Sequence, residues 1–207
     1  MGLFITFEGI DGSGKSTQAR LLAEDLRAAG ETVTLTREPG GSEGAEEIRR
    51  LLVEGEPGRW SAETEMLLFT AARRDHVERT INPALDRGEI VISDRFVDST
   101  RAYQGVSGKR HLVDKVHALM IGLEADLTLI FDLDPAKALS RAGARGGRED
   151  RFERKGLGFQ QALRTAFRNI ARANPTRCSL IAADGAPDAI AHDVRSAVDA
   201  WREARDG

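Results

Sequence analysis

The stretch "FEGIDGSGKST", residues 7–17, decides the fold of this 207-residue chain. It ends an apolar run that is typical of a buried strand, and Gly9, Gly14, Lys15 and Ser16 match the pattern G-x-x-x-x-G-K-[ST] in full. Glycines allow successive backbone N–H groups to turn toward an anion, and the helix that follows adds its positive end. The stretch therefore predicts a strand, a phosphate-binding loop and a helix, in that order.

The side chains of this loop suit a nucleoside triphosphate. Lys15 has the reach to contact the β- and γ-phosphates, and the Ser16 hydroxyl is a suitable ligand for Mg²⁺. We expect the whole loop to bind the triphosphate, through Gly9, Ile10, Asp11, Gly12, Ser13, Gly14, Lys15, Ser16 and Thr17.

Short apolar runs rich in β-branched residues alternate along the chain with longer stretches of helical periodicity. The runs cover residues 3–7, 32–36, 89–93, 127–133 and 178–183. Strands that are apolar on both faces and alternate with helices predict a parallel sheet covered on both sides. We therefore expect a three-layer α/β fold with a five-stranded parallel sheet, formed by residues 1–207 as a single domain.

The composition excludes several classes of protein. The net charge of −3 provides no general basic surface for nucleic acid or an anionic membrane. No apolar run approaches the roughly 18 residues of a membrane span, and no cationic segment precedes the first apolar run as in a secretory signal. The one cysteine, Cys178, excludes an internal disulfide, and its apolar surroundings predict an unreactive core thiol. We expect a cytoplasmic protein.

A phosphate-binding loop does not by itself define a reaction. A GTPase switch would need a guanine-reading N-K-x-D motif, which the sequence lacks. The apolar run at 89–93 is followed instead by Asp94 and Arg95. Because ligands bind at the carboxyl ends of parallel strands, we expect Asp94 to hold Mg²⁺ and Arg95 to pair with a second anion. A salt bridge between these two residues is the alternative.

Four further segments make the chain resemble a known family. They are "TREPGG" (36–41), "LLFTAARRDH" (67–76), "ISDRFVDSTRAYQG" (92–105) and "RAGARGGREDRFERKG" (141–156). With the glycine loop, and in this order, they resemble bacterial thymidylate kinase (dTMP kinase) from residue 3 to about residue 155. The resemblance implies transfer of the γ-phosphoryl group of ATP to dTMP, giving dTDP and ADP, with Mg²⁺ as cofactor.

The resemblance implies a pocket for thymine and its sugar. Phe69 and Arg73 are four apart and share a helix face, so Phe69 would stack on the base while Arg73 bonds its carbonyl edge. Thr100 and Gln104 resemble positions that read the polar edge of the base. Tyr103 resembles a tyrosine that occupies the place of a ribose 2′-hydroxyl and so favours deoxyribose.

The resemblance also assigns the groups around the acceptor phosphate. Arg95 would neutralise this phosphate, with Arg37 as a second candidate for the same task. Asp11, inside the glycine loop, matches the acidic position that touches the 3′-hydroxyl of the acceptor sugar.

Residues 141–156 combine five arginines with four glycines and have no apolar face. We expect a mobile lid that closes on the triphosphate; a solvated basic face is the alternative. Some relatives carry an arginine where this chain has Ser13, and the resemblance then places the catalytic arginine in the lid. Arg145 is the first candidate and Arg151 the second.

Other interpretations stay open. A deoxynucleoside kinase, or another deoxynucleotide kinase, is the nearest; a nucleoside kinase needs a base for a neutral 5′-hydroxyl, and Glu38 follows the second predicted strand where such a base would lie. A non-catalytic nucleotide-binding sensor module is the other. The family resemblance also implies a homodimer, whose face would come from helices within 61–86 and 109–124.

Overall fold

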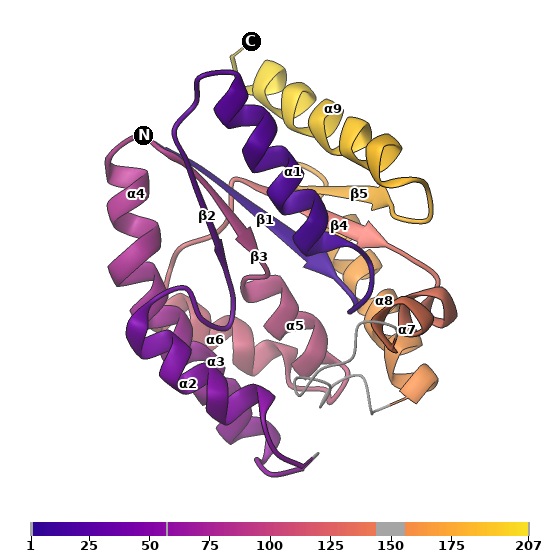
Figure 1. Cartoon of the computed structure of the whole chain (residues 1–207). Coiled ribbons are helices and arrows are strands. Elements are labelled where there is room, and N and C mark those ends of the chain that lie inside the picture. Colours follow the sequence, from indigo (N-terminus) through magenta and orange to yellow (C-terminus); the bar gives the residue numbers. More distant parts are fainter. Residues whose placement is uncertain (1, 57, 144–155, 207) are drawn as a thin grey trace.

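The computed structural model describes residues 2–56, 58–143 and 156–206. Five strands form one parallel sheet in the order β2-β3-β1-β4-β5 (Figure 1). In chain order the strands are β1 Leu3–Gly9, β2 Val33–Arg37, β3 Ile90–Asp94, β4 Leu127–Asp132 and β5 Cys178–Ala182. The α/β fold and all five predicted strands are confirmed, and the bounds differ from the predicted ones by one or two residues.

Helices connect the strands. They are α1 Lys15–Ala28, α2 Glu43–Val53, α3 Ala62–His76, α4 Asn82–Asp86, α5 Val97–Gly105, α6 Arg110–Met120, α7 Pro135–Gly143, α8 Gly156–Ala173 and α9 Pro187–Asp206, and the π-helical segment η1 Val77–Ile81 joins α3 to α4.

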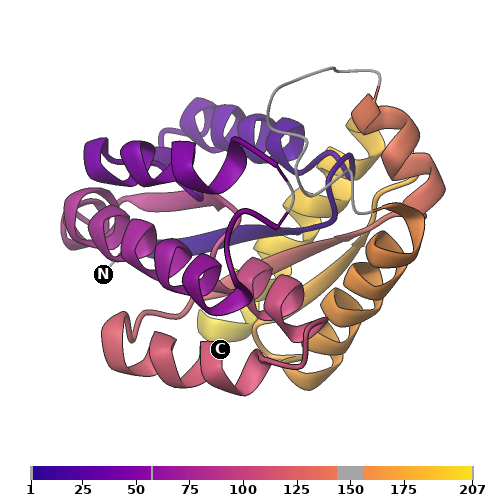
Figure 2. The same cartoon turned by 90° about the horizontal axis from the view of Figure 1, so that it is seen from below.

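The helices cover both faces of the sheet, as Figures 1 and 2 show. Helices α1 and α9 pack together on one face, and α5 and α8 pack together on the other, with α3 and α6 beside α5. Successive side chains of β1 point to opposite faces of the sheet, so β1 packs against the helices on both faces. Ile5 and Phe7 join a core cluster with Leu26 of α1, whereas Phe4 joins a second cluster with Val97 of α5.

The strand order brings three loops together at one edge of the sheet. Asp94, the last residue of β3, pairs with Phe7 of β1 on one side and with Arg37 of β2 on the other. The loops that follow β1, β2 and β3 therefore start side by side. This carboxyl edge is where open parallel sheets bind ligands.

Two of the sequence predictions concern reactivity and membranes. Cys178 is buried and unpaired, and burial raises the pKa of its thiol to about 12, so the predicted inert core thiol is confirmed. Within the described ranges of the chain, no helix is long and apolar enough to cross a membrane.

Candidate active site

The loop after β1 is shaped by its glycines and by α7. Gly12 has φ +81°, and a Cβ atom on it would overlap the carbonyl oxygen of Ala138 in α7. Gly14 has φ +93° and forms the N-cap of α1, so the helix begins at Lys15. The backbone can follow this path because glycine tolerates positive φ, and the loop thereby presents the start of α1 to a cleft.

Lys15 lies at the bottom of this cleft and is 5% exposed. Its Nζ donates to the carbonyl oxygen of Ile10 at 2.7 Å. Burial, followed by the neighbouring positive charge of Arg95, lowers the pKa of Lys15 to about 8, although Asp11 and Asp94 oppose the change. A phosphate bound here would provide a counter-charge for the Lys15 ammonium group and would favour its protonated form.

Ser16 and Asp94 form an oxygen pair across the cleft. The Ser16 hydroxyl donates to Oδ2 of Asp94, while Oδ1 of Asp94 is buried without a hydrogen-bond partner among the described residues. Hydroxyl and carboxylate oxygens suit Mg²⁺, which keeps several waters and takes further ligands from phosphates. Ser16 and Asp94 are therefore the candidate magnesium ligands. No group of three or more His, Cys, Asp or Glu able to hold a metal occurs in the described part of the chain.

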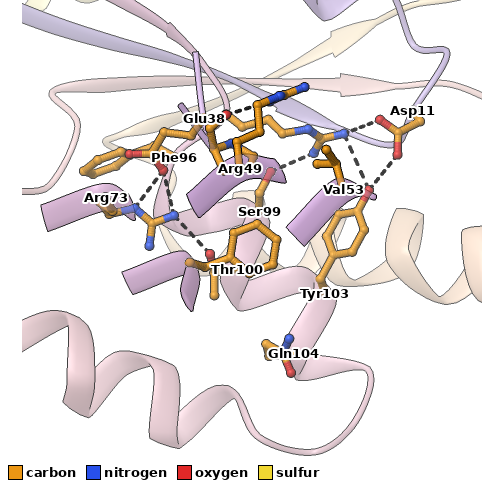
Figure 3. Close-up of a pocket in the computed structure, with 13 residues that line it drawn as sticks. Asp11, Glu38, Arg49, Val53, Arg73, Phe96, Ser99, Thr100, Tyr103 and Gln104 are labelled. Atoms are coloured by element: carbon orange, nitrogen blue, oxygen red, sulfur yellow. Dashed lines mark hydrogen bonds and ion pairs between the residues drawn. The ribbon is translucent and has the colours of Figure 1, made fainter. Parts of the chain in front are cut away.

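Arg95 follows Asp94, and its guanidinium is hydrogen-bonded to Asp11, Ser99 and Tyr103, the three partners that Figure 3 labels. Its NH2 donates to Oδ1 of Asp11 at 2.6 Å, and its NH1 donates to the Ser99 hydroxyl at 2.8 Å. The Tyr103 hydroxyl donates to the second oxygen of Asp11 at 3.0 Å. An acidic group of the glycine loop is thereby tied to the β3–α5 junction.

The groups of this cluster shift one another's pKa values. Burial alone would raise the pKa of Asp11, but Arg95, Lys15 and the Tyr103 hydroxyl outweigh it and lower that pKa to about 2. Burial, with the nearby Asp11 carboxylate, raises the pKa of Tyr103. Asp11 is therefore an anion and Tyr103 a neutral donor at neutral pH.

Arg73 of α3 takes part in a second, fully buried cluster. Its Nε donates to Oε2 of Glu38 at 2.8 Å, and its NH2 donates to the Thr100 hydroxyl at 3.0 Å. Nδ1 of His76 lies 3.2 Å from Oε1 of Glu38. Burial would raise the pKa of Glu38, but Arg73 and His76 overcome it and lower that pKa. Because both Glu38 oxygens are engaged and the group is a weakened base, this geometry disfavours the general base of a nucleoside kinase.

The two clusters line an inner cavity of about 140 Å³. Phe69, Val53 and Phe96 supply its apolar walls, and the Arg73 guanidinium stands 5.0 Å from the Phe96 ring centre. A larger loop cleft of about 670 Å³ runs past Lys15 and Ser16. The inner cavity and the loop cleft share four lining residues, namely Asp11, Glu38, Arg49 and Arg95.

The remaining predicted residues fall in different places. Thr100 and Gln104 are buried on α5 and line the inner cavity, and the Gln104 amide donates to Glu65 at 3.2 Å. Arg37 lines the loop cleft, but its side chain is 56% exposed and pairs with Glu46. Arg145 and Arg151 belong to residues 144–155, which lie outside the described residues. Of the predicted lid, residues 141–143 form the end of helix α7, and Gly156 begins helix α8.

Sequence reasoning missed several residues of the site. Arg49 lines both cavities and donates to the Pro39 carbonyl at 2.6 Å. Ser99 links α5 to Arg95, and Glu65 receives the Gln104 amide. Arg49 and Glu65 lie in helical segments that contain several other charged residues. The sequence therefore gives no signal that distinguishes these two site residues from charged residues exposed to solvent. Ser99 lies within the quoted segment 92–105, but Arg95 precedes helix α5 and has a non-helical backbone, so helical spacing could not have paired the two residues.

Comparison with known proteins identifies the family. A family model described as thymidylate kinase matches residues 7–194. The thymidylate kinase of Ruegeria pomeroyi is 64% identical over 199 residues, which span 95% of this chain and 94% of that protein. The thymidylate kinase of Caulobacter vibrioides is 52% identical over 205 residues, spanning 95% and 96%.

A solved structure agrees with the sequence relatives. The crystal structure of thymidylate kinase from Ehrlichia chaffeensis superposes with a TM-score of 0.77 at 37% sequence identity, covering 96% of this chain and 98% of that one. The chain belongs to the thymidylate kinase family and is a kinase that phosphorylates dTMP to dTDP.

Proposed function

We propose that dTMP binds in the inner cavity and ATP in the loop cleft, so that the two substrates meet at Asp11 and Arg95. The observation that carries this proposal is the pair of cavities with a common wall, one beside the glycine loop and one beside Phe69 and Arg73. An acceptor phosphate at the common wall would face the end of the triphosphate. This is the arrangement that in-line transfer requires.

The base and sugar would be selected by the walls of the inner cavity. Phe69 offers an aromatic face for thymine, and Arg73, which Glu38 and Thr100 hold, offers donors to a carbonyl oxygen. Gln104 lines the same wall. Tyr103 and Asp11 would lie beside the sugar, where the carboxylate accepts a hydrogen bond from a 3′-hydroxyl.

The acceptor phosphate would bind to Arg95. Among the described residues, its Nε–H has no hydrogen-bond partner, and a guanidinium can offer two donors to one phosphate. The nucleophile is a phosphate oxygen with a second pKa of about 6, so it is already ionised at neutral pH and needs no general base. Arg37, at the mouth of the loop cleft, would add positive charge.

The donor phosphates would be held by the backbone N–H groups of the glycine loop and by Lys15. Ser16 and Asp94 would hold Mg²⁺, which supplies charge neutralisation on the triphosphate. Arg145, with Arg151 as second candidate, would stabilise charge on the transferring group. Catalysis then consists of positioning two anions and balancing their charge.

An acceptor panel tests the proposal. ADP production from ATP and Mg²⁺ would be measured with dTMP, dUMP, UMP, dCMP, dAMP, dGMP and thymidine. We expect strong turnover with dTMP, weaker turnover with dUMP and little with UMP, because Phe69, Arg73 and Tyr103 act together. Turnover with thymidine but not with dTMP would overturn the proposal, and ATP binding without any turnover would point to a sensor.

We further propose that the enzyme is a homodimer, joined through α3 and α6. Leu67 of α3 and Leu119 and Met120 of α6 are 56%, 83% and 52% exposed, and Arg74 of α3 donates to the Met120 carbonyl at 2.7 Å. Exposed apolar side chains on two touching helices suit an interface. Sedimentation should give twice the chain mass, and Leu119→Arg should shift it to the monomer.

The chain is proposed to be a single domain that works in the cytoplasm. All five strands share one sheet, and Cys178 is an unpaired thiol, which fits a reducing compartment. One cooperative unfolding transition is expected, and two separate transitions would argue for two domains. Cell fractionation would test the location.

A further inference from the structure

Arg95 has an unusual backbone. Its φ is 74°, in the left-handed region that non-glycine residues rarely adopt, so the conformation must be held by its surroundings. The Arg95 N–H donates to the Phe7 carbonyl at 2.9 Å, and the Ser93 hydroxyl donates to the Arg95 carbonyl at 2.7 Å. These two contacts fix the arginine itself, whereas the peptide that follows it needs another anchor.

That anchor is Glu8, the residue before Gly9 on β1. Glu8 is 0% exposed and lines neither the inner cavity nor the loop cleft. Its Oε1 accepts the Phe96 N–H at 2.8 Å, and its Oε2 accepts the Ser99 hydroxyl at 2.6 Å. One buried carboxylate thus contacts the peptide next to Arg95 and the serine that receives the Arg95 side chain.

The direction of the second chain of hydrogen bonds follows from chemistry. Above its pKa of about 7, Glu8 is an ionised carboxylate, which only accepts hydrogen bonds, and a guanidinium only donates. The single proton of the Ser99 hydroxyl therefore points to Glu8, and an oxygen lone pair faces NH1 of Arg95 at 2.8 Å. Without Glu8, the Ser99 hydroxyl could rotate and lose its alignment with the arginine.

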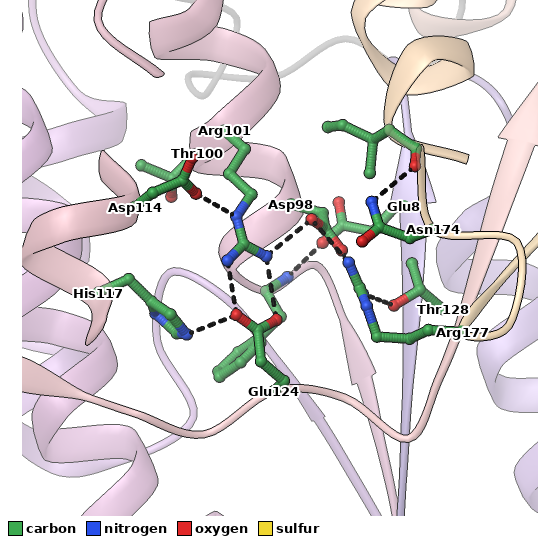
Figure 4. A network of polar contacts seen from close by, with 12 residues as sticks. Glu8, Asp98, Thr100, Arg101, Asp114, His117, Glu124, Thr128, Asn174 and Arg177 are labelled. Carbon is green, nitrogen blue, oxygen red and sulfur yellow. Dashed lines mark hydrogen bonds and ion pairs between the residues drawn. The ribbon is translucent and has the colours of Figure 1, made fainter. Parts of the chain in front are cut away.

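Helix α5 is also attached to the sheet by residues other than Glu8. Figure 4 shows the neighbouring network, in which Asp98 of α5 accepts from Arg101 and from Arg177 at the start of β5. Arg177 also donates to Thr128 of β4 at 2.7 Å. This network connects α5 to β4 and to the residue before β5. The hydrogen bonds of Glu8 are instead made to the Phe96 amide, next to Arg95 in the chain, and to the Ser99 hydroxyl, which accepts from the Arg95 side chain.

We propose that Glu8 is a positioning residue for the transfer reaction, which orients the Arg95 guanidinium toward the acceptor phosphate through the Phe96 amide and the Ser99 hydroxyl. The proposal rests on the proposed role of Arg95 in binding that phosphate. Glu8 itself touches neither substrate. Its loss should weaken the binding of dTMP and leave the binding of ATP unchanged.

The test compares Glu8→Gln and Ser99→Ala with the wild type in steady-state kinetics at pH 8, above the pKa of Glu8 of about 7. Glutamine keeps the volume but offers one acceptor instead of two, and alanine removes the intermediate hydroxyl. We expect KM for dTMP to rise roughly 10-fold in each, the effect of one charge-assisted hydrogen bond, with KM for ATP within about two-fold. Thr6→Val is the matched control, because Thr6 shares the face of β1 and bonds Thr128 at 2.9 Å.

A second pair of variants separates the possible failures. In an Arg95→Ala background, which should itself raise KM for dTMP, Glu8→Gln should add nothing, because its effect passes through Arg95. Normal dTMP kinetics in Arg95→Ala would overturn the role of Arg95. Impaired Arg95→Ala with normal Glu8→Gln and Ser99→Ala would overturn the role of Glu8 alone. An equal rise of KM for dTMP in Thr6→Val would reduce Glu8 to a structural residue.

Discussion

Replacing Glu38 with glutamine would test how the base-binding arginine is held. The side chains of Arg73 and Glu38 are 3% and 4% exposed, so the change leaves a buried guanidinium without its counter-charge. Removal of one partner of a buried ion pair costs about 3–5 kcal/mol. For a chain of this length each kcal/mol lowers Tm by about 2–4 °C, so Glu38→Gln should lower Tm by roughly 6–20 °C.

Thermal unfolding followed by circular dichroism measures the effect. The matched control is Glu46→Gln, since Glu46 pairs with Arg37 at the surface, where the two side chains are 42% and 56% exposed. An exposed pair of this kind contributes about 0–1 kcal/mol, so the control should change Tm by no more than about 4 °C. The double variant Glu38→Gln/Arg73→Met should recover part of the loss, because no unpaired charge remains buried.

Kinetics of the same variant separate two roles for Glu38. If Glu38 holds Arg73, Glu38→Gln should raise KM for dTMP and leave most of kcat. Loss of a general base would instead lower kcat by about 10²–10⁴ at saturating dTMP. A stable Glu38→Gln variant with a 100-fold lower kcat and unchanged KM would refute the assignment of Glu38 to Arg73.

Three further changes probe other parts of the fold and site. Because burial, followed by Asp98, raises the pKa of Glu8 from 4.5 to about 7, the native state keeps a proton that the unfolded chain releases between these values. The contribution of Glu8 to the free energy of unfolding should then fall by about 3 kcal/mol as pH rises from 4.5 to 7, and urea titrations should show it as the difference in pH dependence between the wild type and Glu8→Gln. Gly12→Ala should destabilise the chain more than Gly30→Ala, since both glycines have positive φ but only Gly12 meets α7; chemical denaturation compares them. Lys15→Met should lower kcat at least about 100-fold in the ADP assay, and an active variant would exclude Lys15 from phosphate binding.

The sequence predicted the elements and the glycine loop because their signals are local. The loop motif spans residues 9–16, and each strand is a short apolar run, of which the three central strands β1, β3 and β4 are buried on both faces. Phe69 and Arg73 were paired by helical spacing, and they line one cavity. Residues four apart in a helix lie on the same face wherever the helix packs, so this spacing can predict neighbouring side chains before a structure is known.

The partners of buried charges were beyond the sequence because they depend on distant contacts. Glu38 and Arg73 are 35 positions apart, and Glu8 and Ser99 are 91 apart. In the sequence Glu38 looked like a free acid next to a strand, whereas in the fold both of its oxygens are engaged. Glu8 belongs to the quoted stretch 7–17, but its role could not be predicted from the sequence. That role depends on the fold, which brings the Phe96 N–H within hydrogen-bond distance of the Glu8 carboxylate.

The wall shared by the two cavities has a thermodynamic consequence. Asp11 belongs to the loop that surrounds one cavity, and its carboxylate bonds Arg95, which lines both. A phosphate that draws Arg95 toward it changes the charge that Lys15 and Asp11 experience, so occupation of one cavity alters the free energy of filling the other. Such coupling is reciprocal: the factor by which the acceptor changes the affinity for the donor equals the factor by which the donor changes the affinity for the acceptor. If dTMP and ATP bind as proposed, Asp11 and Arg95 would couple the two binding events.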